Sequence, residues 1–168
     1  MIIDDGSGEA LTSKIGTLWQ VADDASVFAG GTDMLRSEMI LGRSCVRLTG
    51  NMDLCETGGV LQMRLDLRPG GGLLDVGDYE GVRFSVWGNN KIYAMRLKTP
   101  DTPEPWQCYR AYFDTDKTWH ETLLPFDEFE GHGTSEPLDV NRLSALALVA
   151  TGRGFKADLA VCEMSFYR

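Results

Sequence analysis

Apolar and polar residues alternate along much of this chain, in short segments bounded by glycine, proline and asparagine. In residues 59–67 the odd positions from Leu61 to Leu67 are apolar, while the even positions are mostly polar. An alternation with a period of two is typical of a half-buried β-strand. The segments predicted to be strands are 18–21, 34–41, 44–49, 59–67, 82–87, 92–98, 107–115, 118–124, 145–150, 155–159 and 160–167.

Turn residues indicate how some of these strands connect. The sequence Gly88-Asn89-Asn90 favours positive φ, so a hairpin is expected to join 82–87 to 92–98. Segments 107–115 and 118–124 are expected to form the next pair. Together with the scarcity of helical patterns, these features predict an all-β protein, a jelly-roll β-sandwich.

Two segments depart from the alternation. Residues 145–150 are almost entirely apolar, as expected of a central strand buried on both faces. Residues 138–143 are expected to form a single helical turn. The aromatic residues Trp119, Phe126 and Phe129 surround a proline corner and are predicted to be structural.

Length and composition suit one domain with a full core. The chain has 168 residues, of which 43% are hydrophobic and 24% are charged. Residues 1–16 are rich in small polar residues and are expected to be a flexible lead-in to a domain at 17–168. The chain has no apolar run of about 18 residues and no basic, apolar leader, so no membrane insertion and a cytoplasmic location are expected.

The charge balance excludes some partners. The formal net charge is -9 and no basic cluster is present, which argues against binding to nucleic acid or to an anionic membrane. The four cysteines form no Cys-x-x-Cys pair, so buried reduced thiols are expected rather than a zinc site. The cysteines are Cys45, Cys55, Cys108 and Cys162.

No catalytic constellation is found. The two histidines, His120 and His132, are not accompanied by a Gly-x-Ser-x-Gly nucleophile motif. The acidic residues at strand ends are interpreted as solvated turn residues. Asp23, Asp24 and Asp33 could bind calcium, but their spacing is not diagnostic. The prediction is therefore a non-enzymatic protein without a metal site or a cofactor.

A polar face is the sharpest candidate for function. Several polar positions fall on strands that would neighbour one another in a jelly roll, and two further residues are expected nearby. A concave face of this kind could bind a carboxylate, a sugar or a peptide through planar donors and aromatic stacking. The alternative is a solvated outer face whose arginines pair with nearby Asp and Glu. The residues predicted for the face are Arg64, Ser85, Arg96, Arg110 and Tyr112, with Trp87 and His120 nearby.

Six motifs in the same order resemble the complex I intermediate-associated protein 30 family, whose fold is a galactose-binding-domain-like jelly roll. The region 109–129 matches best. The segment 27–32 is similar to the family's Val-Met-Gly-Gly-x-Ser but carries an extra residue, and Asn89 replaces an aspartate. The other matching positions are Trp19, Asp24, 58–64, 79–93, 154–155 and 159–163.

This resemblance implies a function that composition cannot supply. It implies an assembly factor, or chaperone, for respiratory complex I (NADH:ubiquinone oxidoreductase) that binds complex I subunits or intermediates as protein partners. The fold also resembles family 11 carbohydrate-binding modules, so a carbohydrate-binding or small-molecule-binding module using the concave face is the alternative. Because no transit peptide is seen, the resemblance implies a bacterial member.

Overall fold

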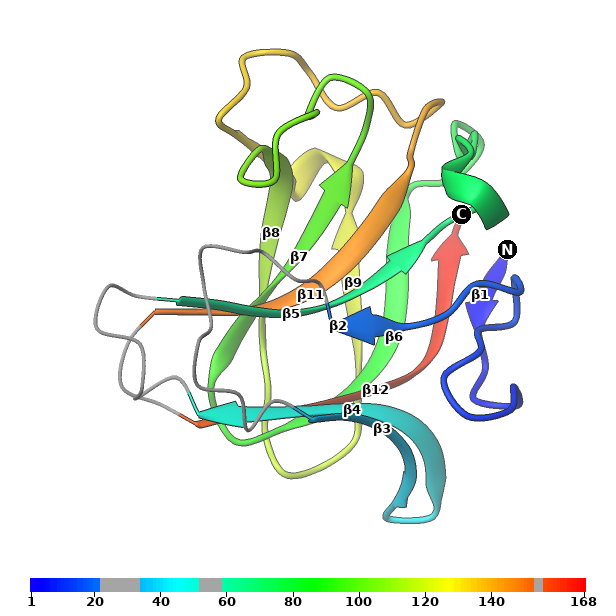
Figure 1. Cartoon of the computed structure of the whole chain (residues 1–168), viewed down its shortest axis with the longest axis vertical. Coiled ribbons are helices and arrows are strands. Elements are labelled where there is room, and N and C mark those ends of the chain that lie inside the picture. The colour runs from blue at the N-terminus through cyan, green and yellow to red at the C-terminus, as the bar shows by residue number, and fades with distance from the viewer. Residues whose placement is uncertain (22–33, 52–58, 153–155) are drawn as a thin grey trace.

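Two antiparallel sheets face one another in the computed structural model, which describes residues 1–21, 34–51, 59–152 and 156–168 (Figure 1). The first, here called the β12 sheet, has the order β3-β4-β12-β6-β9, with β1 also paired to β12. Its strands are β1 (Ile2–Asp4), β3 (Met34–Ile40), β4 (Arg43–Asn51), β6 (Gly81–Gly88), β9 (His120–Pro125) and β12 (Lys156–Tyr167).

The second, here called the β11 sheet, has the order β10-β8-β7-β11-β5-β2. Its strands are β2 (Gln20–Val21), β5 (Gly59–Asp66), β7 (Ile92–Lys98), β8 (Cys108–Asp114), β10 (Glu130–His132) and β11 (Ala145–Gly152). Two short 3₁₀ turns, η2 (Pro69–Gly71) and η3 (Phe126–Glu128), complete the described elements. The prediction of an all-β jelly-roll sandwich is confirmed.

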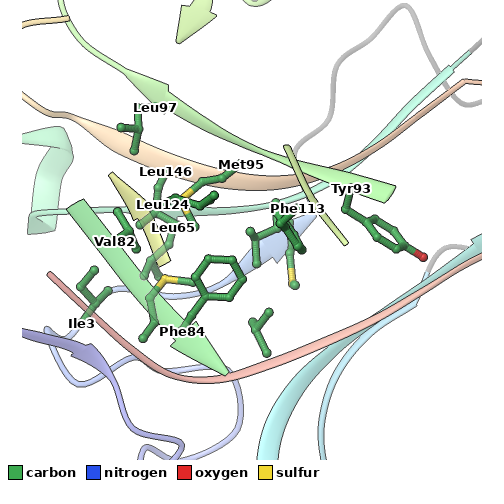
Figure 2. Close-up of a cluster of buried hydrophobic side chains, with 14 of the residues drawn as sticks. Ile3, Leu65, Val82, Phe84, Tyr93, Met95, Leu97, Phe113, Leu124 and Leu146 are labelled. Carbon is green, nitrogen blue, oxygen red and sulfur yellow. The ribbon is translucent and has the colours of Figure 1, made fainter. Parts of the chain in front are cut away.

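The hydrophobic core lies between the sheets, because each strand directs alternate side chains inward. Phe84 of β6 meets Phe113 of β8 edge to face, with ring centroids 5.1 Å apart (Figure 2). Strand β11 lies between β7 and β5, and Ala145–Ala150 is buried throughout, as the apolar run predicted. Phe129 is buried in this core, and Phe126 packs against it.

The two predicted strand pairings are wrong. Strand β6 belongs to the β12 sheet and β7 to the β11 sheet, so the turn at 88–90 carries the chain between sheets. Asn90 does have positive φ, at 63°, and the Tyr93 hydroxyl donates to Asn89 Oδ1 at 2.6 Å. Strands β8 and β9 are likewise in different sheets. A turn signal shows where a chain reverses but not which strand it pairs with.

The described segment 138–143, expected to form a single helical turn, contains a turn in which the Arg142 amide donates to the Asp139 carbonyl at 3.1 Å, but it forms no helix. Val140 and Leu143 instead exchange backbone hydrogen bonds with the segment that precedes β6. The Leu74 amide donates to the Leu143 carbonyl at 2.8 Å, and the Val76 amide donates to the Val140 carbonyl at 2.9 Å. This extended pairing buries Leu143, which a single exposed helical turn would not do.

The N-terminal residues make contacts with both the β12 sheet and the main core. Strand β1 pairs with β12, and Ile3 is fully buried in the main core. Trp19 Nε1 donates to the carboxylate Oδ2 of Asp4 at 2.6 Å, and both residues are buried. Two strands were expected at 155–159 and 160–167, but the described residues 156–167 form one strand, β12, whose register shifts between Cys162 and Ser165.

Candidate binding face

A single row of side chains crosses the outer face of the β11 sheet. In the strand registers Arg64 of β5 lies opposite Ala147, Ala147 opposite Arg96 of β7, and Arg96 opposite Arg110 of β8. Gln20 extends the row at one end, and Glu130 at the other. The neighbouring positions Leu65, Leu97 and Tyr109 face the core. We call Arg64, Arg96 and Arg110 the arginine row.

Small side chains surround the middle of this row. Ala94 precedes Arg96 by two positions on β7, and Val149 lies opposite Ala94 on β11. Ala145 and Ala147 occupy the same face of β11, and all four residues are buried. The middle of the arginine row is therefore surrounded by small, buried apolar side chains.

Arg96 differs from the other two arginines in its burial. Only 6% of the residue is exposed, and its Nε atom is buried without a hydrogen-bond partner. Within the described ranges Arg96 forms no ion pair. Arg64, by contrast, donates from Nε and Nη2 to Asp66 Oδ1 at 3.2 and 3.1 Å. A buried guanidinium without a counter-charge is unfavourable, since burial removes its hydration.

Arg110 contacts two polar neighbours of the face. Its Nη2 donates to His132 Nδ1 at 3.0 Å, and its Cζ lies 5.5 Å from the centroid of the Tyr112 ring. The pKa of His132 is lowered by desolvation and then by the nearby charges of Arg110 and Arg96. The Tyr112 side chain projects into solvent, with 58% of the residue exposed.

Cys108 lies on the same face, beside the arginines. Burial raises the pKa of its thiol, and the charges of Arg96, Arg110 and Lys98 oppose this shift. Lys98 Nζ donates to the backbone oxygens of Glu104 and Gln107, at 2.7 and 2.5 Å. The side chains of Arg96, Arg110 and Lys98 therefore make the part of the face around Cys108 locally positive, although the whole protein is acidic.

The structure does not bring the other predicted residues to this face. Ser85 and Trp87 lie on the outer face of the β12 sheet, where Arg47 stacks over Trp87 at 5.2 Å and Arg43 donates to Ser85 Oγ at 3.2 Å. His120 lies on edge strand β9, opposite Val86. The expectation that these three residues adjoin the arginines is wrong, because it depended on pairing β6 with β7 and β8 with β9.

Trp119 belongs to the same opposite face. It is half-buried in a satellite cluster with Cys45, Ala160 and Cys162, and its Nε1 donates to the Ile40 carbonyl at 2.9 Å. The side chain is therefore structural but lies outside the main core. The predicted positions Asp23, Asp24, Asp33 and Cys55, and the motif at 27–32, lie outside the described residues.

Sequence reasoning missed two contributors to the face. His132 was missed because β10 has only three residues and cannot show a clear alternation. Gln20 was missed for the same reason, because it lies on β2, which has only two residues. Gln20 and Asp66 also line an open pocket of about 260 Å³ that adjoins this end of the row. No helix in the described part of the chain is long and apolar enough to cross a membrane.

The fold and the face define a β-sandwich of the jelly-roll class. Residues 11–159 match the family described as Complex I intermediate-associated protein 30 (CIA30), and the chain belongs to this family. No curated protein matches the chain.

Solved structures share the fold at low sequence identity. The family 11 carbohydrate-binding module of the cellulosomal cellulase Lic26A-Cel5E of Clostridium thermocellum is 14% identical, with a TM-score of 0.69 over 99% of this chain and 93% of that one. A family 11 module from Clostridium thermocellum in complex with a β-1,3-1,4-mixed-linked tetrasaccharide is 12% identical, with a TM-score of 0.67 over 99% and 94%.

A family 30 module, from the cellulosomal cellulase Cel9D-Cel44B of Clostridium thermocellum, is 11% identical, with a TM-score of 0.64 over 98% of this chain and 96% of that one. Similarity at this level of identity concerns the fold alone. The side chains of the outer face must therefore be interpreted from this chain itself.

Proposed function

We propose that this chain is a non-enzymatic binding protein that holds a polypeptide partner against the outer face of the β11 sheet during assembly of respiratory complex I. Membership of the CIA30 family supports the assembly role. The observation that carries the binding role is the arginine row, in which Arg96 is buried without a counter-charge. An unpaired buried guanidinium is costly to fold and is better explained by a ligand than by stability.

The chemistry of the face suits a polypeptide. A guanidinium presents planar donors that fit carboxylate groups in a bidentate manner. Tyr112 adds an exposed aromatic ring beside Arg110, and tyrosine and arginine are both enriched at protein interfaces. The arginine row also extends across four strands, from β5 to β8, which provides length for a segment of chain.

The absence of an enzymatic role is part of the proposal. The only thiol on the described face, Cys108, is buried and has a raised pKa, so it is protonated at neutral pH and a poor nucleophile. His132 lies opposite Cys108 in the strand register, but among the described residues its ring nitrogen accepts a hydrogen bond from Arg110 and makes none with the thiol. These groups bind and orient, but they do not form an acid–base or nucleophilic pair.

Carbohydrate binding is the second candidate, favoured by one observation. A module of the same fold forms a complex with a tetrasaccharide. Here Tyr112 and Trp106 each have 58% of the residue exposed, and exposed rings can stack on sugars. Titration of the purified protein with soluble glucans and galactosides separates the two candidates, because only carbohydrate binding gives a saturable response.

Paired measurements of stability and partner capture test the proposed function. We expect Arg64→Gln and Arg110→Gln to melt near the wild-type temperature, since exposed ion pairs contribute about 0–1 kcal/mol. Both variants should lose capture of the partner identified with the wild-type protein from its native cell. Arg83→Gln is the matched control, because Arg83 pairs with Glu121 at 3.8 Å on the other sheet. Intact capture by both row variants would favour a solvated face without function.

A further inference from the structure

We propose that Arg96 and Arg110 form a receptor for one carboxylate group, carried by an acidic side chain of a polypeptide partner. This inference rests on the proposed function and names the chemistry by which the partner is held. It follows from three features of the face: the register of the two arginines, the burial of Arg96, and the neutralisation of Arg64 by another residue.

The register places two like charges face to face. Arg96 and Arg110 are directly opposite one another on neighbouring antiparallel strands. Side chains in this arrangement have Cβ atoms about 4.5–5.5 Å apart, and like charges there are destabilising. Arg64, two strands away from Arg96, has its own counter-ion in Asp66. Arg96 and Arg110 are therefore the two arginines of the row that form no ion pair within the described residues, although Glu130 lies opposite Arg110 on β10.

The donors of this pair lack acceptors of opposite charge. Neither arginine forms an ion pair within the described residues, and the hydrogen bond that Arg110 makes goes to the uncharged Nδ1 of His132. The Nε of Arg96 is buried without an acceptor. A carboxylate supplies two acceptor oxygens and one negative charge, so a single group satisfies both the hydrogen-bonding and the electrostatic deficit.

The surroundings favour a polypeptide over a small free anion. Tyr112 lies beside Arg110, and Arg64 continues the row beyond Ala147. These positions provide contacts on both sides of the carboxylate site, along the direction in which an extended chain would cross the strands. A free anion would use only the two arginines. Glu130, opposite Arg110 on the outermost strand, carries a negative charge of its own, so the site accepts one carboxylate rather than two.

Binding of a defined peptide tests the proposal. The probe is a capped peptide of alternating alanine and glutamate, and its twin carries glutamine in place of glutamate. We expect saturable binding of the glutamate peptide by calorimetry and little or none of its twin. Arg96→Met and Arg110→Gln should each weaken binding at least about thirtyfold, as for loss of a desolvated charge-assisted hydrogen bond. Arg83→Gln should bind as the wild type does.

Thermal stability separates a binding role of Arg96 from a structural one. Replacing an unpaired buried charge by an apolar side chain of similar volume is neutral or stabilising. Arg96→Met should therefore melt at or above the wild-type temperature while it loses peptide binding. If Arg96→Met melts lower and still binds the glutamate peptide, the proposal is overturned. If Arg96→Met does not fold, peptide binding by Arg110→Gln tests the proposal by itself. This second variant is expected to fold because Arg110 is only half-buried.

Other results of the peptide experiment also test the carboxylate receptor. Equal binding of the two peptides, or peptide binding that survives Arg110→Gln, overturns the carboxylate receptor. Saturable binding of polygalacturonate or inorganic phosphate with no binding of the peptide overturns the polypeptide source. The arginine-row variants could lose capture of the native partner while the wild-type protein binds the two peptides equally. That result would leave the proposed function intact and overturn this inference. If the glutamate peptide binds selectively but the variants capture the native partner normally, the proposed function is overturned instead.

Discussion

At the residue scale, His132 reports on the charges of the arginine row. Its pKa lies below the ordinary value because of desolvation, Arg110 and Arg96, in that order. Removing a nearby positive charge makes the protonated imidazole less unfavourable, so Arg96→Met should raise the pKa of His132. Because burial and Arg110 persist, that pKa should remain below the ordinary histidine value. Proton NMR titration of the imidazole measures this change.

Arg83→Gln is the matched control for this titration, because Arg83 lies on β6 of the other sheet and pairs with Glu121 at 3.8 Å. This variant should leave the pKa of His132 unchanged. An unchanged or lower pKa of His132 in Arg96→Met would mean that the guanidinium of Arg96 lies too far from β10 to affect this histidine. Bound glutamate peptide should raise the pKa of His132, since a negative charge favours the imidazolium.

At the element scale, the hairpin between β3 and β4 contains a conformational mismatch. Ile40 pairs with Arg43, so Leu41 and Gly42 form a two-residue turn, with φ of 47° and 80°. Left-handed backbone costs a residue such as leucine roughly 1–2 kcal/mol, and asparagine tolerates it better. Leu41→Asn should increase the free energy of unfolding by about 1 kcal/mol, as measured by urea denaturation.

The matched control for this hairpin is Leu123→Asn. Leu123 is also an exposed leucine, at 49% against 71% for Leu41, but it lies in the edge strand β9 without positive φ. Its replacement should leave stability unchanged or reduce it. A loss of stability in Leu41→Asn would show that the exposed Leu41 side chain makes a contact that outweighs the backbone conformation.

Strand β1 offers a second test at this scale. Ile3 is fully buried while its neighbour Ile2 is 55% exposed, so the two isoleucines differ mainly in what they pack against. Ile3→Ala should reduce the free energy of unfolding by about 2–5 kcal/mol, the usual cost of a core cavity. Ile2→Ala should cost far less. If both variants reduce the free energy of unfolding by the same small amount in chemical denaturation, residues 1–16 serve only as a lead-in to the domain.

Sequence patterns predicted elements better than they predicted partners. Alternation located β5, β6 and β7 and gave the correct outward phase for Arg64 and Arg96, because the side-chain period of a strand is local. Sheet membership is not local, so Ser85, Trp87 and His120 were assigned to the wrong face. The short strands β1, β2 and β10 carry too few residues for a periodic signal, and with β10 the role of His132 was missed.

At the scale of the whole molecule, fold and function are carried by different parts of the chain. The two apolar inner faces define a jelly roll that is shared with carbohydrate-binding modules at 11–14% identity. Such a core constrains which residues face inward and leaves the outer faces free to differ. The arginine row lies on an outer face, so its chemistry belongs to this chain rather than to the fold.

Net charge makes a further prediction about how an acidic partner approaches. The chain carries a formal charge of -9, whereas the carboxylate receptor is locally positive. At an ionic strength of about 0.01 M the Debye length is about 30 Å, so the glutamate peptide experiences the repulsion of the whole molecule. Near 0.15 M that length is about 8 Å, and the nearby arginines dominate.

The association rate constant of the glutamate peptide should therefore rise as salt is added over this range, although the receptor and its ligand carry opposite charges. Stopped-flow measurements at several salt concentrations provide the test. A peptide with lysine in place of glutamate is the control for long-range charge: any association it shows should slow with salt, because it is attracted by the net charge. If the rate constant for the glutamate peptide falls with salt instead, the local field of Arg96 and Arg110 outweighs the net charge even at long range.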